Sequence, residues 1–273
     1  MVTVNLSGGL GNQLFQYAAG KTMSQMTGRP LSLNIAKYSK HGERRVFQLF
    51  DAIEDHDGTQ VVNDQDLLLR KYEILLKRSN LTIKKKGMVV VSENNFFDCL
   101  SHRYDSYDLL FDGYFQDTRY FLGYNIADLV TLRKFNSSLT SQAGKKTIAI
   151  HIRRGDYLLS KHHIHGITPW CFYQQAITEL RTLFPDALIA MFSDDKEVVP
   201  PFRVDIRVSD LMLKDTEEFL LLAKSDAFVI PNSTFAWWAA ALSGSAFVYA
   251  PKRWYASRDA SETFFLKHWT VLC

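Results

Sequence analysis

One stretch of this sequence, residues 147–157, reads Thr147-Ile148-Ala149-Ile150-His151-Ile152-Arg153-Arg154-Gly155-Asp156-Tyr157. Its first half is apolar and rich in β-branched residues, which is typical of a strand buried in a parallel sheet. The polar residues that follow therefore lie at the carboxyl end of that strand. In open α/β sheets this is the end at which ligands bind.

The polar half of this stretch holds one histidine, two adjacent arginines and one aspartate, at His151, Arg153, Arg154 and Asp156. Burying all four in a core would carry a heavy desolvation cost. The planar guanidinium matches phosphate oxygens in shape and charge. The cluster therefore predicts an anionic ligand, most simply a nucleotide pyrophosphate, and the alternative is a salt-bridged strand end.

Strands and helices alternate on both sides of this stretch. The first series is a strand at 2–6, a glycine-rich turn, a helix at 12–27 and a strand at 31–35. The second has strands at 147–152, 187–192, 204–208, 227–230 and 246–249, with helices from 168, at 216–224 and at 234–242. This alternation predicts an α/β fold with parallel sheets. We expect two Rossmann-like domains, residues 1–140 and 141–273, facing across a cleft.

The stretch between these two series is aromatic-rich. Core packing explains most of this set, and a sugar-stacking surface is the alternative. Its members are Phe97, Tyr104, Tyr107, Phe111, Tyr114, Phe115, Tyr120 and Phe121. A helical stretch is also expected at 64–76.

Composition limits the classes of protein to which the chain belongs. Of its 273 residues 47% are hydrophobic, enough for a substantial core, and the net charge is only +3, which argues against a nucleic-acid-binding protein. The three cysteines are widely spaced, which favours a reducing compartment. No signal peptide and no apolar run of about 20 residues is found. We therefore expect a cytoplasmic protein, at most peripheral to the inner face of the membrane.

The first turn reads Ser7-Gly8-Gly9-Leu10-Gly11-Asn12-Gln13. It is not a dinucleotide fingerprint, because Leu14 stands where the third glycine is required and Asn34 where the ribose-binding acid is expected. The glycines predict a turn that lets the backbone approach a ligand closely. Asn12 and Gln13 at a helix start could orient a hydroxyl or a developing anion. The alternative is a tight turn with Asn12 as the helix cap.

Two further strand ends carry polar groups. Ser193-Asp194-Asp195 ends one strand, and its carboxylates could bind ribose hydroxyls, guanine N–H groups or a divalent metal. Helix capping by Asp194 is the alternative. Pro231-Asn232-Ser233-Thr234 leads from another strand into a helix, and hydroxyls with free N–H groups at such a junction form an anion site.

These blocks together resemble the α-1,2-fucosyltransferase family, the inverting, GDP-fucose-dependent glycosyltransferase family 11. The resemblance rests on residues 8–17, 151–157, 192–195 and 232–238, in the family's order. It implies a GT-B-like architecture, with an acceptor domain followed by a GDP-fucose-binding domain. The chain departs from the family pattern at Asp226, where a histidine is usual, and at Pro231, where an alanine is usual.

The resemblance also implies a role for each matching residue. Arg153, Arg154 or both would neutralise the β-phosphate, and Asn12 would approach the fucose. Further GDP-fucose-binding residues would be His151, Asp194, Asp195, Asn232, Ser233, Thr234 and Phe235, and the acceptor side would hold Gly9, Gly11, Asn12 and Gln13.

The implied reaction transfers fucose to the 2-hydroxyl of a β-galactoside with inversion, in O-antigen or capsule synthesis. An arginine and helix N–H donors would stabilise the departing GDP, so we expect no cofactor and no divalent metal requirement. A general base would take the acceptor proton. Asp156 is the first candidate, the group His162, His163 and His165 is the second, and a dissociative path without a strong base is the third.

Two other classes remain open. A fucosyltransferase of another linkage, or a transferase using another GDP-sugar, would share the nucleotide-binding motifs. A non-catalytic sugar- or nucleotide-binding module would bind GDP without transfer.

Overall fold

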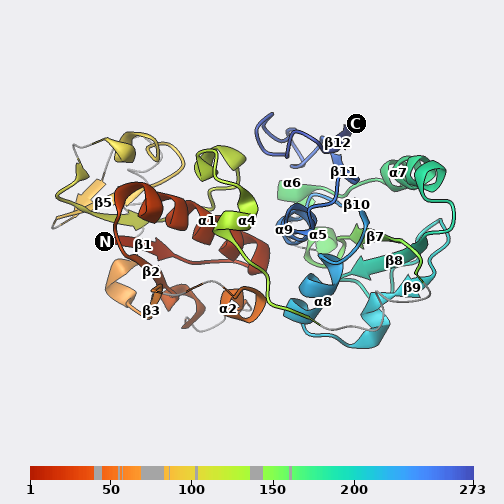
Figure 1. The fold of residues 1–273 in the computed structure, drawn as a ribbon, viewed down its shortest axis with the longest axis horizontal. Coiled ribbons are helices and arrows are strands. Elements are labelled where there is room, and N and C mark those ends of the chain that lie inside the picture. Colours follow the sequence, from red (N-terminus) through yellow and green to blue (C-terminus); the bar gives the residue numbers. More distant parts are fainter. Residues whose placement is uncertain are drawn as a thin grey trace. The chain divides into compact units, whose positions relative to one another are not determined.

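The protein is described here by a computed structural model over residues 1–39, 45–54, 56, 58–68, 83–85, 87–101, 104–135, 144–159 and 162–273. The chain forms two compact units, Met1–Thr131 and Leu132–Cys273, and each is built around its own sheet (Figure 1). The predicted boundary between residues 140 and 141 lies outside the described residues.

The sheet of the first unit has the order β3-β2-β1-β6-β5-β4. All neighbours are parallel except β4 and β5. The strands are β1 (Val2–Asn5), β2 (Leu31–Asn34), β3 (Gln60–Val62), β4 (Ile83–Lys85), β5 (Met88–Val91) and β6 (Asp108–Phe111). The strand order changes direction between β1 and β6, because the chain passes from β1 to β2 on one side and reaches β6 from β5 on the other.

The main helix of this unit, α1 (Leu10–Thr27), packs closely on β1. Gly20 permits this approach, since a Cβ there would lie 2.4 Å from a methyl of Val4. The unit also contains two single-turn helices, α2 (Leu49–Ala52) and α4 (Ile126–Leu129), and short 3-10 turns that include η3 (Asp98–Leu100) and η5 (Thr118–Phe121).

Most of the aromatic-rich region forms the core of the first unit. Phe96, Phe111 and Phe115 are fully buried and contact one another with ring centroids 5.1 to 6.1 Å apart. Tyr114, by contrast, has 47% of its surface exposed. The core explanation therefore holds for most of the set and fails for Tyr114 and for Phe97, which is 44% exposed and stacks on Tyr120.

The second sheet has the order β12-β11-β10-β7-β8-β9, and its pairs are parallel. The strands are β7 (Thr147–Ile152), β8 (Leu188–Ser193), β9 (Ile206–Arg207), β10 (Ala227–Val229), β11 (Val248–Pro251) and β12 (Thr270–Leu272). As in the first sheet, the order changes direction at one point, here between β7 and β10.

Helices cover both faces of this sheet. They are α5 (Gly155–Leu159), α6 (His162–His165), α7 (Trp170–Leu183), α8 (Asp215–Leu222) and α9 (Thr234–Ser243). Ile148, Ile150 and Ile152 pack under α7, whereas the alternate residues of β7 face α8 and α9. Figure 1 shows α7 and α8 on opposite sides of β7 and β8.

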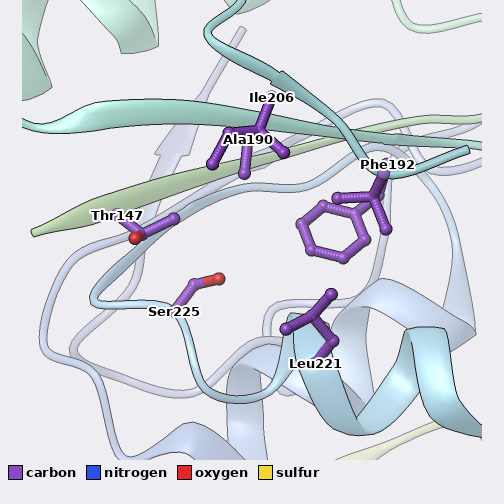
Figure 2. A pocket seen from close by; sticks show the side chains of 7 residues that line it. Thr147, Ala190, Phe192, Ile206, Leu221 and Ser225 are labelled. Atoms are coloured by element: carbon purple, nitrogen blue, oxygen red, sulfur yellow. The ribbon is translucent and has the colours of Figure 1, made fainter. Parts of the chain in front are cut away.

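A small pocket lies on the α8 face of this sheet. Figure 2 shows its mainly apolar lining, which includes Thr147, Ala190, Phe192 and Leu221. It has a volume of about 20 Å³, room for little more than one water molecule. It also reaches Thr147, the first residue of β7, so it extends away from the carboxyl ends of the strands.

The predicted α/β class is confirmed, and the strands of the second unit lie close to their expected positions. The predicted helix at 64–76 is wrong where it is described, because residues 65–67 form one 3-10 turn; residues 69–82 lie outside the described part. The sequence also missed β3, β4, β5, β6 and β12. The cleft expected between the domains stays a prediction. Over the described residues, no helix is both long enough and apolar enough to cross a membrane.

Candidate functional site

Three of the polar segments come to one edge of the second sheet. Residues 153–156 follow β7, residues 194–195 follow β8, and residues 230–233 follow β10. In the parallel register Ile152 lies opposite Ser193, so the turns after β7 and β8 are neighbours. The edge between β7 and β10 is also where the strand order changes direction, which is where doubly wound sheets bind nucleotides.

Asp194 holds the turn after β7 in place. Its Oδ1 accepts the backbone N–H of Arg154 at 2.9 Å, and its Oδ2 lies 3.0 Å from Nη1 of Arg153. Gly155 makes room for this carboxylate, since a Cβ there would be 2.4 Å from Oδ2. The ion pair satisfies part of the charge on Arg153, whose guanidinium also lies over the ring of Tyr157 at 5.3 Å.

Arg154 has a different environment. Its guanidinium stacks on Trp170 at 4.4 Å and donates one long hydrogen bond, 3.4 Å, to the carbonyl of Thr168. Over the described residues, no carboxylate pairs with this guanidinium. Stacking and a carbonyl fix its position without cancelling its charge, so Arg154 can still neutralise an anion.

His151 is the last inward-facing residue of β7 on the α9 side. Its side chain is buried, with its ring centroid 5.7 Å from that of Phe235. Burial, and secondarily the charge of Arg153, lower the pKa of the imidazole to about 3. The ring is therefore neutral, and no described residue hydrogen-bonds to its buried Nδ1. A buried atom of this kind is what a ligand N–H or hydroxyl would satisfy.

Helix α9 begins at the same edge. Ser233 is its N-cap residue, and its hydroxyl makes no cap hydrogen bond. Thr234 and Phe235 form the first turn, and Phe235 contacts Phe219 of α8 with ring centroids 5.2 Å apart. The N-terminus of α9, which is the positive end of its dipole, therefore lies at the sheet edge that also carries the arginines, an arrangement that suits an anion.

Asn232 has a structural role that the sequence did not indicate. Its Nδ2 donates to the carbonyls of His165 (2.7 Å) and Trp254 (3.0 Å), and its Oδ1 accepts from the hydroxyl of Thr168 at 3.2 Å. Its carbonyl accepts the hydroxyl of Tyr157. The side chain is buried and has these partners. Asn232 therefore joins three loops, a structural role, and the ligand contact expected from the sequence stays a prediction.

The remaining predicted residues of this unit are placed as follows. Asp195 stabilises its own turn by accepting the N–H of Glu197 at 3.0 Å. His163 is exposed, and His165 stacks on Tyr157 with ring centroids 4.6 Å apart. Asp156 lies in α5, but its side chain, like that of His162, is outside the described part. The base assignment stays a prediction.

Glu218 of α8 borders the same region, and sequence reasoning missed it. Burial, followed by the charges of Asp215 and Asp194, raises the pKa of its carboxyl to about 7. Acidic residues in the first turn of a helix are usually explained by the helix dipole, and α8 carries Asp215, Glu217 and Glu218 there. That explanation fits Glu217, which accepts the N–H of Lys214 at 2.9 Å. Burial in the fold, together with the proximity of Asp215 and of Asp194, which is remote in sequence, distinguishes Glu218.

The glycine turn of the first unit lies at the carboxyl end of β1. Gly8 has a φ of 81°, and its carbonyl accepts the hydroxyl of Tyr38. Helix α1 begins at Leu10, because the carbonyl of Gly9 already accepts the N–H groups of Asn12 and Gln13. The alternative of Asn12 as the helix cap is therefore wrong. Gly11 is buried in the first turn of α1.

The two amides of this turn differ. Gln13 is fully buried, and its side chain donates to the carbonyls of Gly8 and Val46 and accepts the N–H groups of Gln48 and Leu49. It braces the loop and has no capacity for a ligand, contrary to the expected acceptor role. Asn12 is half-buried, and its Oδ1 accepts from Nε2 of Gln116 at 2.9 Å.

The departure from the family pattern at Asp226 lies away from this site. Its carboxylate accepts the N–H of Thr147 at 2.8 Å and pairs with Lys146 at 2.7 Å. Both contacts are at the amino end of β7, opposite the edge that carries Arg153 and Arg154. Asp226 therefore fixes the start of two strands.

Comparison with known proteins agrees with this arrangement. The family model described as Glycosyl transferase family 11 matches residues 1–273. The O-antigen biosynthesis glycosyltransferase WbnK of Escherichia coli is 28% identical over 94% of this chain and 96% of its own length. An alpha-1,2-colitosyltransferase of the same species is 26% identical over 95% of this chain and 94% of its own length.

Among solved structures, the fucosyltransferase NodZ from Bradyrhizobium is similar with a TM-score of 0.53 and 15% identity, covering 95% of this chain and 96% of that one. At this identity the likeness concerns the fold alone, which is of the GT-B type. The match over every residue, with the motifs at the edge of the second sheet, assigns the chain to glycosyl transferase family 11.

Proposed function

We propose that this glycosyltransferase is an inverting α-1,2-fucosyltransferase that moves fucose from GDP-fucose to the 2-hydroxyl of a β-galactoside in surface-glycan synthesis. The observation that carries the proposal is the contrast between Arg153, which is paired with Asp194, and Arg154, which is fixed by Trp170 without a carboxylate partner among the described residues. A fixed positive charge beside an uncapped helix start suits a diphosphate. The family membership supplies the reaction class.

In this proposal the second unit binds the donor. Arg154 and the first N–H groups of α9 face the pyrophosphate, and Arg153 orients the loop through Asp194 while adding to the positive field. The neutral His151 accepts a hydrogen bond from the nucleoside at its unsatisfied Nδ1. As the bond to fucose breaks, negative charge collects on GDP, and these fixed donors stabilise it.

The first unit, in turn, binds the acceptor. Its glycine turn and Asn12 lie at the carboxyl edge of β1, the usual ligand edge of such a sheet. The acceptor proton passes to a base near the 2-hydroxyl, with Asp156 as the first candidate and a dissociative path as the alternative. The leaving group is stabilised by the guanidinium and helix donors, and we propose that no divalent metal is needed.

A second candidate is the same linkage with a different sugar. One relative is an alpha-1,2-colitosyltransferase, and its match covers 95% of this chain. The groups at the edge of the second sheet would hold the nucleotide and do not distinguish closely related deoxy sugars. Fucose and colitose donors therefore need to be compared directly.

The test is an assay of purified protein with GDP-fucose, GDP-colitose and GDP-mannose against β-galactosides, with EDTA present, followed by linkage analysis of the product. We expect a 2-O-fucosylated galactoside and equal turnover with and without EDTA. If only GDP-colitose gives a product, the enzyme is a colitosyltransferase, which is the second candidate. Thermal stabilisation by GDP without any transfer would indicate a binding module.

The cellular location of the enzyme is part of the proposal as well. WbnK is named for O-antigen biosynthesis, and the same pathway class would place this enzyme at the inner face of the cytoplasmic membrane, where its acceptor would be made. Co-sedimentation with vesicles containing anionic lipids would test a peripheral contact.

A further inference from the structure

The loop after β6, residues 112–117, presents one exposed aromatic ring, that of Tyr114. Tyr114 has 47% of its surface exposed, whereas the next residue, Phe115, has none. The loop follows the carboxyl end of β6, and β6 pairs with β1, so it lies beside the glycine turn that follows β1. This is the point at which the strand order of the first sheet changes direction, where such sheets bind ligands.

The backbone of this loop is strained. Phe115 has a φ of 53°, in the left-handed region that a bulky side chain rarely adopts. Strain of this kind costs about 1–3 kcal/mol and persists where the surroundings enforce it, often at functional sites. The burial of Phe115 among Phe96, Phe111 and Tyr120 provides that enforcement.

Hydrogen bonds fix the same loop from two sides. A carboxylate oxygen of Glu93 accepts the N–H groups of Tyr114 (2.6 Å) and Phe115 (3.0 Å). Gly113 is required for this contact, since a Cβ there would lie 2.5 Å from that carboxylate. On the other side, Nε2 of Gln16 donates to the carbonyl of Gly113 at 2.9 Å. The result is a rigid platform for the Tyr114 ring.

Polar residues lie close to Tyr114 in the sequence. Gln116, two residues later, is half-buried and donates to Asn12 of α1 at 2.9 Å. An exposed aromatic face beside amide groups matches a pyranose, which has an apolar C–H face and a rim of hydroxyls. Charged partners would not be needed, because the acceptor is a neutral sugar.

Building on the proposed function, we infer that Tyr114 and Gln116 form the acceptor subsite. Tyr114 stacks on the apolar face of the terminal galactose, and Gln116 with Asn12 hydrogen-bonds to its hydroxyls. Glu93 and Gly113 are positioning residues, which hold the loop in its strained form. The sequence offered a sugar-stacking surface as the alternative explanation of the aromatic region. We assign that surface to Tyr114, because the exposed ring of Phe97 already stacks on Tyr120.

Tyr114→Ala tests the inference, with Tyr114→Phe as the conservative variant. The matched control is Tyr124→Ala, because the Tyr124 hydroxyl lies 3.7 Å from the sulfur of Met26 in the last turn of α1, at the opposite end of that helix. The probes are the disaccharides galactosyl-β-1,3-N-acetylglucosamine and galactosyl-β-1,4-N-acetylglucosamine. Binding is followed by saturation-transfer NMR, and transfer by the acceptor KM.

We expect Tyr114→Ala to raise the acceptor KM about tenfold while the KM for GDP-fucose stays within twofold of wild type. Tyr114→Phe and Tyr124→Ala should behave like wild type. Equal acceptor KM values for wild type and Tyr114→Ala would overturn the inference. So would the absence of saturation transfer to either disaccharide in the wild-type protein.

The saturation-transfer NMR measurement distinguishes a failure of this inference from a failure of the proposed function. If the protein binds the disaccharides through Tyr114 but transfers no fucose, the subsite stands and the proposed donor is wrong. If GDP-fucose is bound and transferred while Tyr114→Ala changes neither acceptor binding nor acceptor KM, the enzyme stands and the subsite is wrong.

Discussion

The two units share one architecture and present different chemistry at their carboxyl edges. In each sheet the strand order changes direction beside the first strand of the unit. A helix whose N-cap residue makes no side-chain cap hydrogen bond begins at that edge, α1 after Gly9 and α9 after Ser233. The second unit adds two guanidinium groups there. The first adds amides and an exposed ring. The sheet therefore supplies the place for a ligand, and the side chains at the strand ends decide whether that ligand is anionic or neutral.

Of the changes considered, removal of the Arg154 guanidinium should reduce activity the most. We expect Arg154→Ala to lower kcat by about 10²–10³, the cost of about 2.7–4 kcal/mol that is typical for one charge-stabilising donor. Arg154→Lys should recover part of the activity. Steady-state kinetics of both variants with saturating acceptor provide the measurement.

Arg153→Ala is the comparison variant, since it removes a guanidinium that Asp194 already neutralises in part. Its kcat should fall less than that of Arg154→Ala. Equal losses in the two variants would remove the distinction that we draw between these arginines.

The buried amide of Asn232 should dominate stability in the second unit. Asn232→Ala leaves the carbonyls of His165 and Trp254 without their donor, and each unsatisfied buried group costs about 1–3 kcal/mol. Urea unfolding should show a loss of about 2–4 kcal/mol. Asn63→Ala, which removes an exposed amide that donates to Ser39, should change stability by less than about 0.5 kcal/mol. Similar losses in both would mean that the three loops do not depend on Asn232.

Glu218 should make stability depend on pH. Its carboxyl is more basic in the folded state, with a pKa of about 7 against an ordinary value near 4.5, so folding favours the protonated form. The stabilisation is complete below pH 4.5 and is lost as the pH rises through 7. The loss amounts to about 3–4 kcal/mol, because the two pKa values differ by about 2.5 and each unit of pKa corresponds to about 1.36 kcal/mol.

The Glu218→Gln variant should therefore match wild type in Tm near pH 5 and exceed it at pH 8. Thermal melts across this range provide the measurement. Parallel Tm profiles for the two proteins would show that the carboxyl titrates at its ordinary pKa.

A smaller effect is expected at Gly155. The added methyl of Gly155→Ala would displace Asp194, because a Cβ at residue 155 would lie 2.4 Å from Oδ2 of that carboxylate, and so loosen the turn that carries Arg153 and Arg154. We expect GDP to bind about three- to tenfold more weakly by calorimetry. In an Asp194→Ala background the same change should cost little more, because the clash is gone. Full additivity of the two substitutions would contradict this explanation.

The sequence predicted the second unit better than the first. Strands β7 and β8 are continuous apolar runs bounded by polar clusters, which a pattern shows directly. Strands β3 and β12 have only three residues each, with exposed side chains, so they lack such a pattern. They form because neighbouring strands offer hydrogen bonds.

Within the site, sequence could name the residue types but not their partners. Gln13 and Asn232 are polar residues in motifs, and the pattern predicted ligand contacts for both. Their actual partners, such as Val46 for Gln13 and Trp254 for Asn232, are remote in sequence, so only the fold shows that both amides are already satisfied. Conversely, Tyr114 could not be separated from its buried aromatic neighbours until the exposure of each ring was known.

The role proposed for the second unit depends on recognition of a diphosphate by the Arg154 guanidinium. Calorimetric titration with GDP and GMP, on wild type and Arg154→Ala, measures this recognition. We predict that wild type binds GDP at least about tenfold more tightly than GMP, and that this preference disappears in Arg154→Ala while GMP affinity is nearly unchanged. Equal affinity of wild type for the two nucleotides, or an undiminished preference in Arg154→Ala, would contradict it.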